Sequence, residues 1–194
     1  AEFSLNSYIG VRLAETFKSV TIGDFEIGGV RMLSILNIEN MLLVVCLTFF
    51  ITKFTDRFSK QKMMLIGLII YGIGYVTITS ANSWYLLVIF GFIATIGELI
   101  YSPIKNAELA NMMPTDKRGS YSAFSNLSFS GADLIARSTI IIGAFLIPTM
   151  MSVYIGIILM IGISLIYSGL FVKSSKPIKN RKAILTTTMK MFSK

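Results

Sequence analysis

Long runs of apolar residues, broken by short polar stretches, form the dominant pattern of this sequence. A helix needs about 20 apolar residues to cross the hydrocarbon core of a bilayer. Four runs meet this demand without interruption and are predicted to be membrane-spanning helices: residues 32–51, 63–80, 84–103 and 150–172.

Two further runs are less regular. Residues 121–147 are long enough to span a bilayer but contain one acidic and one basic residue, and residues 1–17 resemble the end of a span whose beginning is missing. We therefore expect an all-α membrane protein, a six-helix transmembrane bundle with five complete spans and a truncated first helix. Residues 1–172 would form this bundle, and residues 173–194 a basic cytoplasmic tail.

Lysine and arginine gather in alternate links between the predicted helices. Cytoplasmic loops carry such an excess, so these links and the C-terminus are predicted to be cytoplasmic. The intervening links, at residues 81–83 and around Pro148, are short and uncharged. The basic residues, in three groups along the chain, are Lys53, Arg57, Lys60 and Lys62; Lys105, Lys117 and Arg118; and Lys173, Lys176, Lys179, Arg181, Lys182, Lys190 and Lys194.

Residues 18–31 fit this orientation less well, because they should be external yet carry charges. The charges cancel, because Lys18 and Arg31 are positive and Asp24 and Glu26 are negative. Gly28 and Gly29 predict a turn in this stretch. Small residues within the spans predict close approach between helices; in the last span they are Gly156, Gly162 and Gly169.

Composition supports a membrane protein and narrows its chemistry. Of the 194 residues, 54% are hydrophobic and 14% charged, against about 25% charged in a typical soluble domain. The net charge of +8 could indicate nucleic-acid binding, but the basic residues flank apolar runs. The expected partner is membrane lipid rather than nucleic acid, and the expected location is the cell membrane, multi-pass, as in the bacterial plasma membrane.

The chain has no histidine and a single cysteine, Cys46, which lies within an apolar run. An intrachain disulfide and sites that depend on imidazole are therefore excluded. We expect no cofactor and no metal site, and any proton relay would use carboxylates.

Glu98 is the most informative charged residue within the predicted spans. Tyr101, Ser102 and Lys105 follow it at i+3, i+4 and i+7 and so share its helix face. A charged group in the membrane needs a partner or water, so this face should point into the bundle or a wet cavity. Glu98 could then take part in proton coupling; the alternative is a structural hydrogen bond to a neighbouring helix.

Three other charged residues lie within the spans. Asp133 and Arg137 are four residues apart on one predicted helix and can neutralise each other, which favours a self-satisfied pair. Glu39 is left open between a cavity residue and a helix–helix hydrogen bond, while Glu108, near the cytoplasmic link, is expected to be solvated. The candidates for proton coupling or the substrate cavity are Glu98, Tyr101, Asp133, Arg137, Glu39 and Asn37.

Several motifs occur in a fixed order along the chain. The link after the second helix reads Asp56-Arg57-Phe58-Ser59-Lys60, and residues 97–103, with Gly97-Glu98 and Pro103, are followed by Ala107, Ala110, Pro114 and Lys117-Arg118-Gly119. Over essentially the whole chain, these motifs and the topology resemble the C-terminal half of a major facilitator superfamily transporter, in particular the bacterial drug:proton antiporters. Residues 6–13 resemble the end of the seventh helix of that family.

The resemblance implies one half of a twelve-helix secondary transporter that works by alternating access, with its substrate near the midplane. It implies proton-coupled efflux of small amphipathic solutes or drugs. The partners would be a small-molecule substrate, protons and a missing N-terminal six-helix half. Asp56, Arg57 and Lys60 would form a conformational gating loop that braces helix ends through its charges.

Two other functions compete with transport. A non-transporting membrane subunit or scaffold would explain six helices but not Glu98 and its polar face. An enzyme is not expected, because the sequence lacks histidine and a Gly-x-Ser-x-Gly motif, and Asp133 has no second membrane aspartate on another helix.

The predicted orientation can be tested with single cysteines placed at Ser59 and at Asn82 after Cys46 is replaced. An impermeant thiol reagent applied to intact cells should label position 82 and spare position 59, because only external links are accessible. Labelling of position 59 but not 82 would reverse the orientation.

Overall fold

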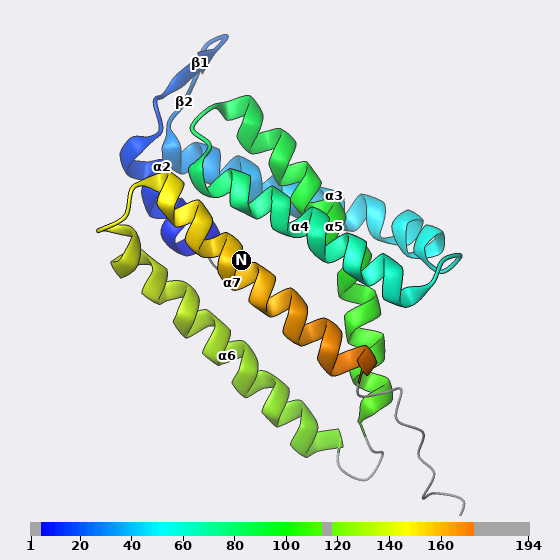
Figure 1. Ribbon diagram of the computed structural model, residues 1–194. Coiled ribbons are helices and arrows are strands. Elements are labelled where there is room, and N and C mark those ends of the chain that lie inside the picture. Colours follow the sequence, from blue (N-terminus) through cyan, green and yellow to red (C-terminus); the bar gives the residue numbers. More distant parts are fainter. Residues whose placement is uncertain (1–4, 114–117, 173–194) are drawn as a thin grey trace, which may run out of the picture.

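The computed structural model describes residues 5–113 and 118–172, which form a bundle of helices (Figure 1). The helical elements are η1 (Leu5–Ile9), α2 (Gly10–Thr16), α3 (Gly29–Thr55), α4 (Lys60–Ser80), α5 (Trp84–Met112), α6 (Arg118–Gly143), α7 (Pro148–Tyr167) and η3 (Ser168–Val172). Two short strands, β1 (Val20–Ile22) and β2 (Phe25–Ile27), connect α2 to α3.

Four helices in the described part of the chain are long and apolar enough to cross a bilayer: α3, α4, α5 and α7, the last together with most of η3. Each coincides with one of the uninterrupted apolar runs, so these four predicted spans are confirmed. The 26-residue helix α6 lies where the fifth span was predicted but is not among them. Its serines, together with Asp133 and Arg137, make it more polar than the other four helices, in agreement with the interruption predicted for this run.

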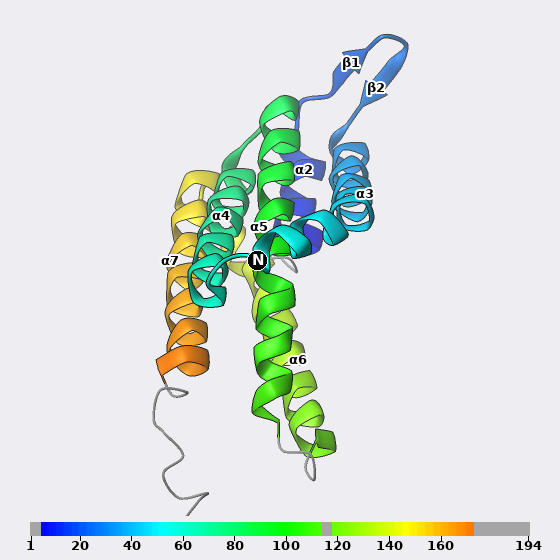
Figure 2. The ribbon, with the colours of Figure 1, turned by 90° about the vertical axis from the view of Figure 1, so that its right-hand side faces the viewer.

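The bundle is built around α4 and α5. These two helices make the most extensive contact, α3 packs on α5, and α7 packs on α4. Figures 1 and 2 show the resulting arrangement, with α6 standing beside this group. The main contact of α6 is with η1.

Glycines bring the backbones of α4 and α5 close together. A Cβ added at Gly67 would lie 2.8 Å from Ile100 Cγ2 and 2.9 Å from the Tyr101 backbone nitrogen. A Cβ added at Gly97 would overlap the backbone nitrogen of Tyr71. At these positions only a glycine permits the observed approach.

The glycines of the last span do not have this role. A Cβ added at Gly162 or Gly169 meets no described atom within 4 Å, and one at Gly156 would make only an ordinary contact with Val76 at 3.5 Å. The expectation of close approach through these three glycines is therefore wrong. They lie on parts of the last span that do not press against a neighbouring backbone.

A buried apolar core lies where η1 and α2 meet α3, α4, α5 and α7. Ile9, Leu13, Met32, Leu87 and Met151 are at most 1% exposed. Elsewhere large apolar side chains point outward from α3; the exposed fractions of Val45 and Phe49 are 80% and 70%. Continuous apolar surface of this kind is typical of helices covered by lipid or by other membrane helices.

A hairpin of β1 and β2 projects beyond the ends of the helices (Figure 2). It is antiparallel, with Val20 opposite Ile27, and its turn contains Gly23, whose φ of 63° glycine adopts without strain. The turn predicted at Gly28 and Gly29 is wrong. Gly28 is the extended residue before α3, and Gly29 is the first residue of that helix.

Helix α5 continues through Pro103 to Met112, beyond the end predicted for this span. A proline inside a helix removes one backbone hydrogen bond and bends the helix without having to end it. Figure 1 shows α5 changing direction along its length.

Two parts of the chain lie outside the described residues. Residues 114–117 include Pro114 and Lys117, which belong to the motif that begins at Gly97-Glu98. Residues 173–194 form the predicted cytoplasmic tail, which therefore remains a prediction.

Gly97→Ala tests the close approach of α4 and α5. The added methyl group would press on backbone atoms of α4, which cannot rotate aside as a side chain can. We expect a lower melting temperature in detergent, with the loss of about 1–3 kcal/mol that is typical of overpacking. Gly162→Ala is the control, since its methyl group enters open space; equal effects of the two substitutions would contradict the packing role of Gly97.

Candidate functional site

A group of polar residues crosses the interface between α3 and α5. Asn40 Nδ2 on α3 donates to Thr95 Oγ1 at 3.0 Å and to Glu98 Oε2 at 3.3 Å, both on α5. Thr95 is only 2% exposed, and its hydroxyl donates to the Gly91 carbonyl one turn earlier at 3.0 Å. The structure therefore places Glu98 in a hydrogen-bonded contact with a neighbouring helix.

Glu39 lies at the same interface. Its Oε2 is buried and has no hydrogen-bond partner among the described residues. A Cβ added at Gly91 would lie 3.2 Å from this oxygen, so the carboxylate sits against the α5 backbone. We call Glu39, Asn40, Gly91, Thr95 and Glu98 the α3–α5 polar cluster.

Helix geometry explains how α3 presents two consecutive residues to one neighbour. Successive residues on an α-helix are separated by about 100° around its axis. Both Glu39 and Asn40 can therefore reach α5 only if the helix contact passes between them. Glu39 then faces Gly91, and Asn40 faces Thr95 and Glu98, one to two turns further along α5.

The polar face predicted to follow Glu98 is divided between two neighbouring helices. Glu98 contacts α3, whereas the Tyr101 ring packs against Tyr71 on α4, with 5.2 Å between ring centroids. Lys105 Nζ lies 5.8 Å from the centroid of the Tyr101 ring, a cation–π contact. Asn37 donates to the Leu33 carbonyl of its own helix at 3.1 Å.

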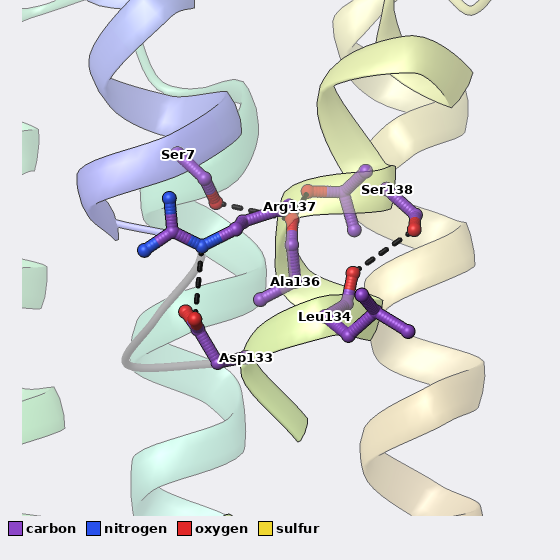
Figure 3. A network of polar contacts seen from close by, with 7 residues as sticks. Ser7, Asp133, Leu134, Ala136, Arg137 and Ser138 are labelled. Atoms are coloured by element: carbon purple, nitrogen blue, oxygen red, sulfur yellow. Dashed lines mark hydrogen bonds and ion pairs between the residues drawn. The ribbon is translucent and has the colours of Figure 1, made fainter. Parts of the chain in front are cut away.

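Asp133 and Arg137 form the predicted pair on α6. Arg137 Nε donates to Asp133 Oδ2 at 2.9 Å, and the Arg137 side chain is 73% exposed. Figure 3 shows the pair together with the contact that attaches α6 to η1, in which Ser7 Oγ donates to the Ala136 carbonyl at 3.1 Å. The pair thus stands on α6, apart from the α3–α5 polar cluster.

The candidate gating loop lies between α3 and α4. Asp56 and Arg57 are exposed, and Lys60 Nζ, at the start of α4, lies 3.6 Å from Glu108 Oε1 on α5. Glu108 was predicted to be solvated, but it forms this ion pair instead. The pair forms because α5 extends far enough to bring the Glu108 carboxylate to the start of α4. The ion pair connects the loop end of α4 with the same end of α5.

Arg12 is a buried residue whose role was not predicted, although an arginine in an apolar stretch is itself a signal. It is 4% exposed, and its Nη2 donates to the carbonyls of Ile78 at 3.1 Å and Ala81 at 2.7 Å. Its Nη1 lies 3.3 Å from Asn82 Oδ1. The last carbonyls of a helix lack intrahelical partners and form its negative end, so Arg12 attaches α2 to the C-terminus of α4.

Comparisons with known proteins agree with the helical architecture. The family model described as Major Facilitator Superfamily matches residues 2–190. The "Na(+), Li(+), K(+)/H(+) antiporter" of Planococcus maritimus is 25% identical over 141 residues, which cover 70% of this chain and 33% of that protein. The chain thus spans about one third of the length of this relative.

A solved structure with a similar fold is the "Crystal structure of a POT family transporter in complex with 5-aminolevulinic acid". The TM-score is 0.67 at 18% sequence identity, over 90% of this chain and 39% of that one. At this identity the likeness shows the fold alone. It confirms the all-α membrane bundle that the apolar runs predict.

Arg12→Gln tests the attachment of α2 to α4. The substitution leaves buried carbonyl oxygens without their donor, which typically costs about 1–3 kcal/mol. We expect a clear fall in the melting temperature in detergent. Asn82→Ala is the matched comparison and should have a smaller effect, because Asn82 is exposed and its bond to Arg12 is the longest of the three; the reverse order would contradict this role of Arg12.

Proposed function

Because this chain belongs to the Major Facilitator Superfamily, we propose that it forms one six-helix half of a secondary active transporter that exchanges protons for small cations by alternating access. The observation that carries this proposal is the α3–α5 polar cluster. It places two glutamates between helices that are otherwise strongly apolar. Ionisable groups at such positions commonly mark ion pathways and proton relays.

The relative from Planococcus maritimus supports cations as the substrates, because its name gives Na⁺, Li⁺, K⁺ and H⁺ as its ions. The sequence resemblance implies amphipathic drugs as substrates, and those that carry a positive charge are also cations. A scaffold without transport activity would leave the two glutamates of the cluster without a role. We therefore favour transport over the scaffold.

The remaining part of the transporter also belongs to the proposal. The chain spans 33% of the antiporter and 39% of the similar solved chain. An N-terminal six-helix half would complete the transporter, and the substrate would bind near the midplane between the halves. The protein would lie in the cell membrane with its C-terminus in the cytoplasm.

In this proposal Glu98 carries the proton. Its carboxylate accepts a hydrogen bond from Asn40 across the α3–α5 interface. Movement of α3 relative to α5 would change this contact, and with it the surroundings of the carboxylate, between the two access states. A proton taken up in one state can then be released in the other.

The loop between α3 and α4 would stabilise one of these states. The ion pair of Lys60 with Glu108 holds the loop end of α4 against α5, and Asp56 and Arg57 are exposed beside it. Exposed ion pairs contribute little to folding stability. A contribution of that size is nevertheless enough to shift the populations of two states of similar free energy.

Glu98→Gln in the intact transporter tests the proton-coupling role. Glutamine keeps the shape and hydrogen-bonding capacity of the side chain but cannot titrate. We expect substrate-driven proton release from proteoliposomes to be abolished, while the melting temperature in detergent stays close to that of the parent protein. Glu26→Gln, on the exposed hairpin, is the control and should leave proton release unchanged.

Two outcomes would contradict this role of Glu98. Normal proton release in the Gln variant would show that another group carries the proton. Lost transport together with a large fall in melting temperature would indicate that the bond between Asn40 and Glu98 is structural.

A further inference from the structure

We propose that the pair of Asp133 and Arg137 on α6 is a cation-binding subsite, in which Arg137 is a resident counter-ion that a positively charged organic substrate displaces from Asp133. The inference rests on the proposed function and deepens it. It separates the carboxylate that binds the cation, on α6, from the carboxylate of Glu98 that carries the proton.

A continuous polar stripe runs along one side of α6. Its members recur at spacings of three or four residues, so they follow one face of the helix. We call them the α6 polar stripe: Ser122, Asn126, Ser130, Asp133 and Arg137. All are exposed except Asp133, which is half-buried. Polar and charged groups at membrane depth need water or a polar partner rather than lipid, so this stripe borders a water-filled space.

The packed face of α6 fixes the direction of the stripe. Ser7 Oγ donates to the Ala136 carbonyl at 3.1 Å, and Ala136 is buried. Two turns further along the same face, a Cβ added at Gly143 would overlap the Tyr8 ring, so α6 lies close against η1 there. Successive residues are separated by about 100° around the axis, which places the stripe roughly a quarter of a turn away from this packed face.

The side of α6 beyond the stripe is apolar. Leu134 and Ile141 lie there, and their exposed fractions are 70% and 69%. The helix therefore presents a charged pair and an apolar surface next to each other. A substrate with a positive group and an apolar body matches this boundary, because its charge can meet Asp133 while its body lies against Leu134 and Ile141. An inorganic ion would use only the first of these two surfaces.

The contact between Asp133 and Arg137 is of a kind that a ligand can replace. Arg137 Nε donates to Asp133 Oδ2 at 2.9 Å, without the second bond of a bidentate pair within the described ranges. The Arg137 side chain is 73% exposed and that of Asp133 34%. Exposed ion pairs of this kind are weak. A guanidinium is itself an organic cation, so the pair also shows which chemistry the Asp133 carboxylate accepts.

The exchange keeps the charge of Asp133 balanced throughout. Without substrate, Arg137 neutralises the carboxylate; with substrate bound, the exposed Arg137 side chain turns into water and the substrate takes its place. Asp133 also lies near the middle of the 26-residue helix α6. This depth agrees with a substrate that binds near the midplane of the bilayer.

The test measures equilibrium binding of radiolabelled tetraphenylphosphonium to the intact transporter in detergent. This probe is an organic cation whose charge does not depend on pH. Arg137→Gln removes the competing cation and keeps Asp133, so we expect binding about twofold to fivefold tighter, the range that corresponds to an exposed ion pair. Asp133→Asn removes the carboxylate and should weaken binding by at least as much.

Two further variants are controls. Arg137→Lys keeps a competing positive charge and should bind the probe as the parent protein does. Ser138→Ala lies on the same helix, and Figure 3 shows Ser138 on the opposite side of α6 from the pair. Its hydroxyl donates to the Leu134 carbonyl of its own helix at 2.9 Å, so this substitution should leave binding unchanged. The comparison of Arg137→Gln with Arg137→Lys holds even if Asp133→Asn does not fold.

The direction of the effects separates this role from a structural one. A purely structural pair would lose binding in both Arg137→Gln and Asp133→Asn, so weaker binding in Arg137→Gln would overturn the inference. Unchanged binding in Asp133→Asn would overturn it as well, as would absence of binding in both the parent protein and Arg137→Gln.

Failure of the proposed function is distinguishable from failure of this inference. Equilibrium binding requires no proton coupling, so we expect Glu98→Gln to bind the probe as the parent protein does, whatever its proton release. Loss of binding in Glu98→Gln with normal binding in Asp133→Asn would place the cation at the α3–α5 polar cluster and overturn the role of Asp133.

Discussion

A polar group surrounded by hydrocarbon has no water to bond with, so it must find its partner within the protein or bind a ligand. This constraint accounts for the main polar contacts of the bundle. Arg12 reaches the C-terminus of α4, Asn40 bridges α3 and α5, and Asp133 pairs with Arg137 on α6. Two buried side-chain atoms have no hydrogen-bond partner among the described residues, Arg12 Nε and Glu39 Oε2.

The contrast between the two faces of α5 relates this constraint to transport. One face meets α4 backbone to backbone at Gly67 and Gly97. The other face meets α3 through the α3–α5 polar cluster and a less extensive contact. In the proposed transport cycle, the polar contacts between α3 and α5 would exchange while the close-packed pair of α4 and α5 stays intact.

Much of the helical architecture and part of the candidate site could be predicted from the sequence. The four apolar spans follow from length and hydropathy, and the pair of Asp133 with Arg137 follows from their spacing on one helix. The polar surroundings of Glu98 were also predictable. Its bond to Asn40 was not predictable, nor was the contact of the Tyr101 ring with Tyr71 on α4.

The sequence by itself determined the properties that depend on one helix at a time: the class of protein, the positions of the apolar spans, and the residues that share a helix face. Only the tertiary structure decided which helix each face meets, including the partners of Arg12 and Asn40, the closeness of Glu39 to Gly91, and the role of Glu108. The physical reason is that helical periodicity relates residues within one turn or two. Contacts between helices depend instead on how all of them pack together, and in a bilayer each polar group takes the partner that this packing brings within reach.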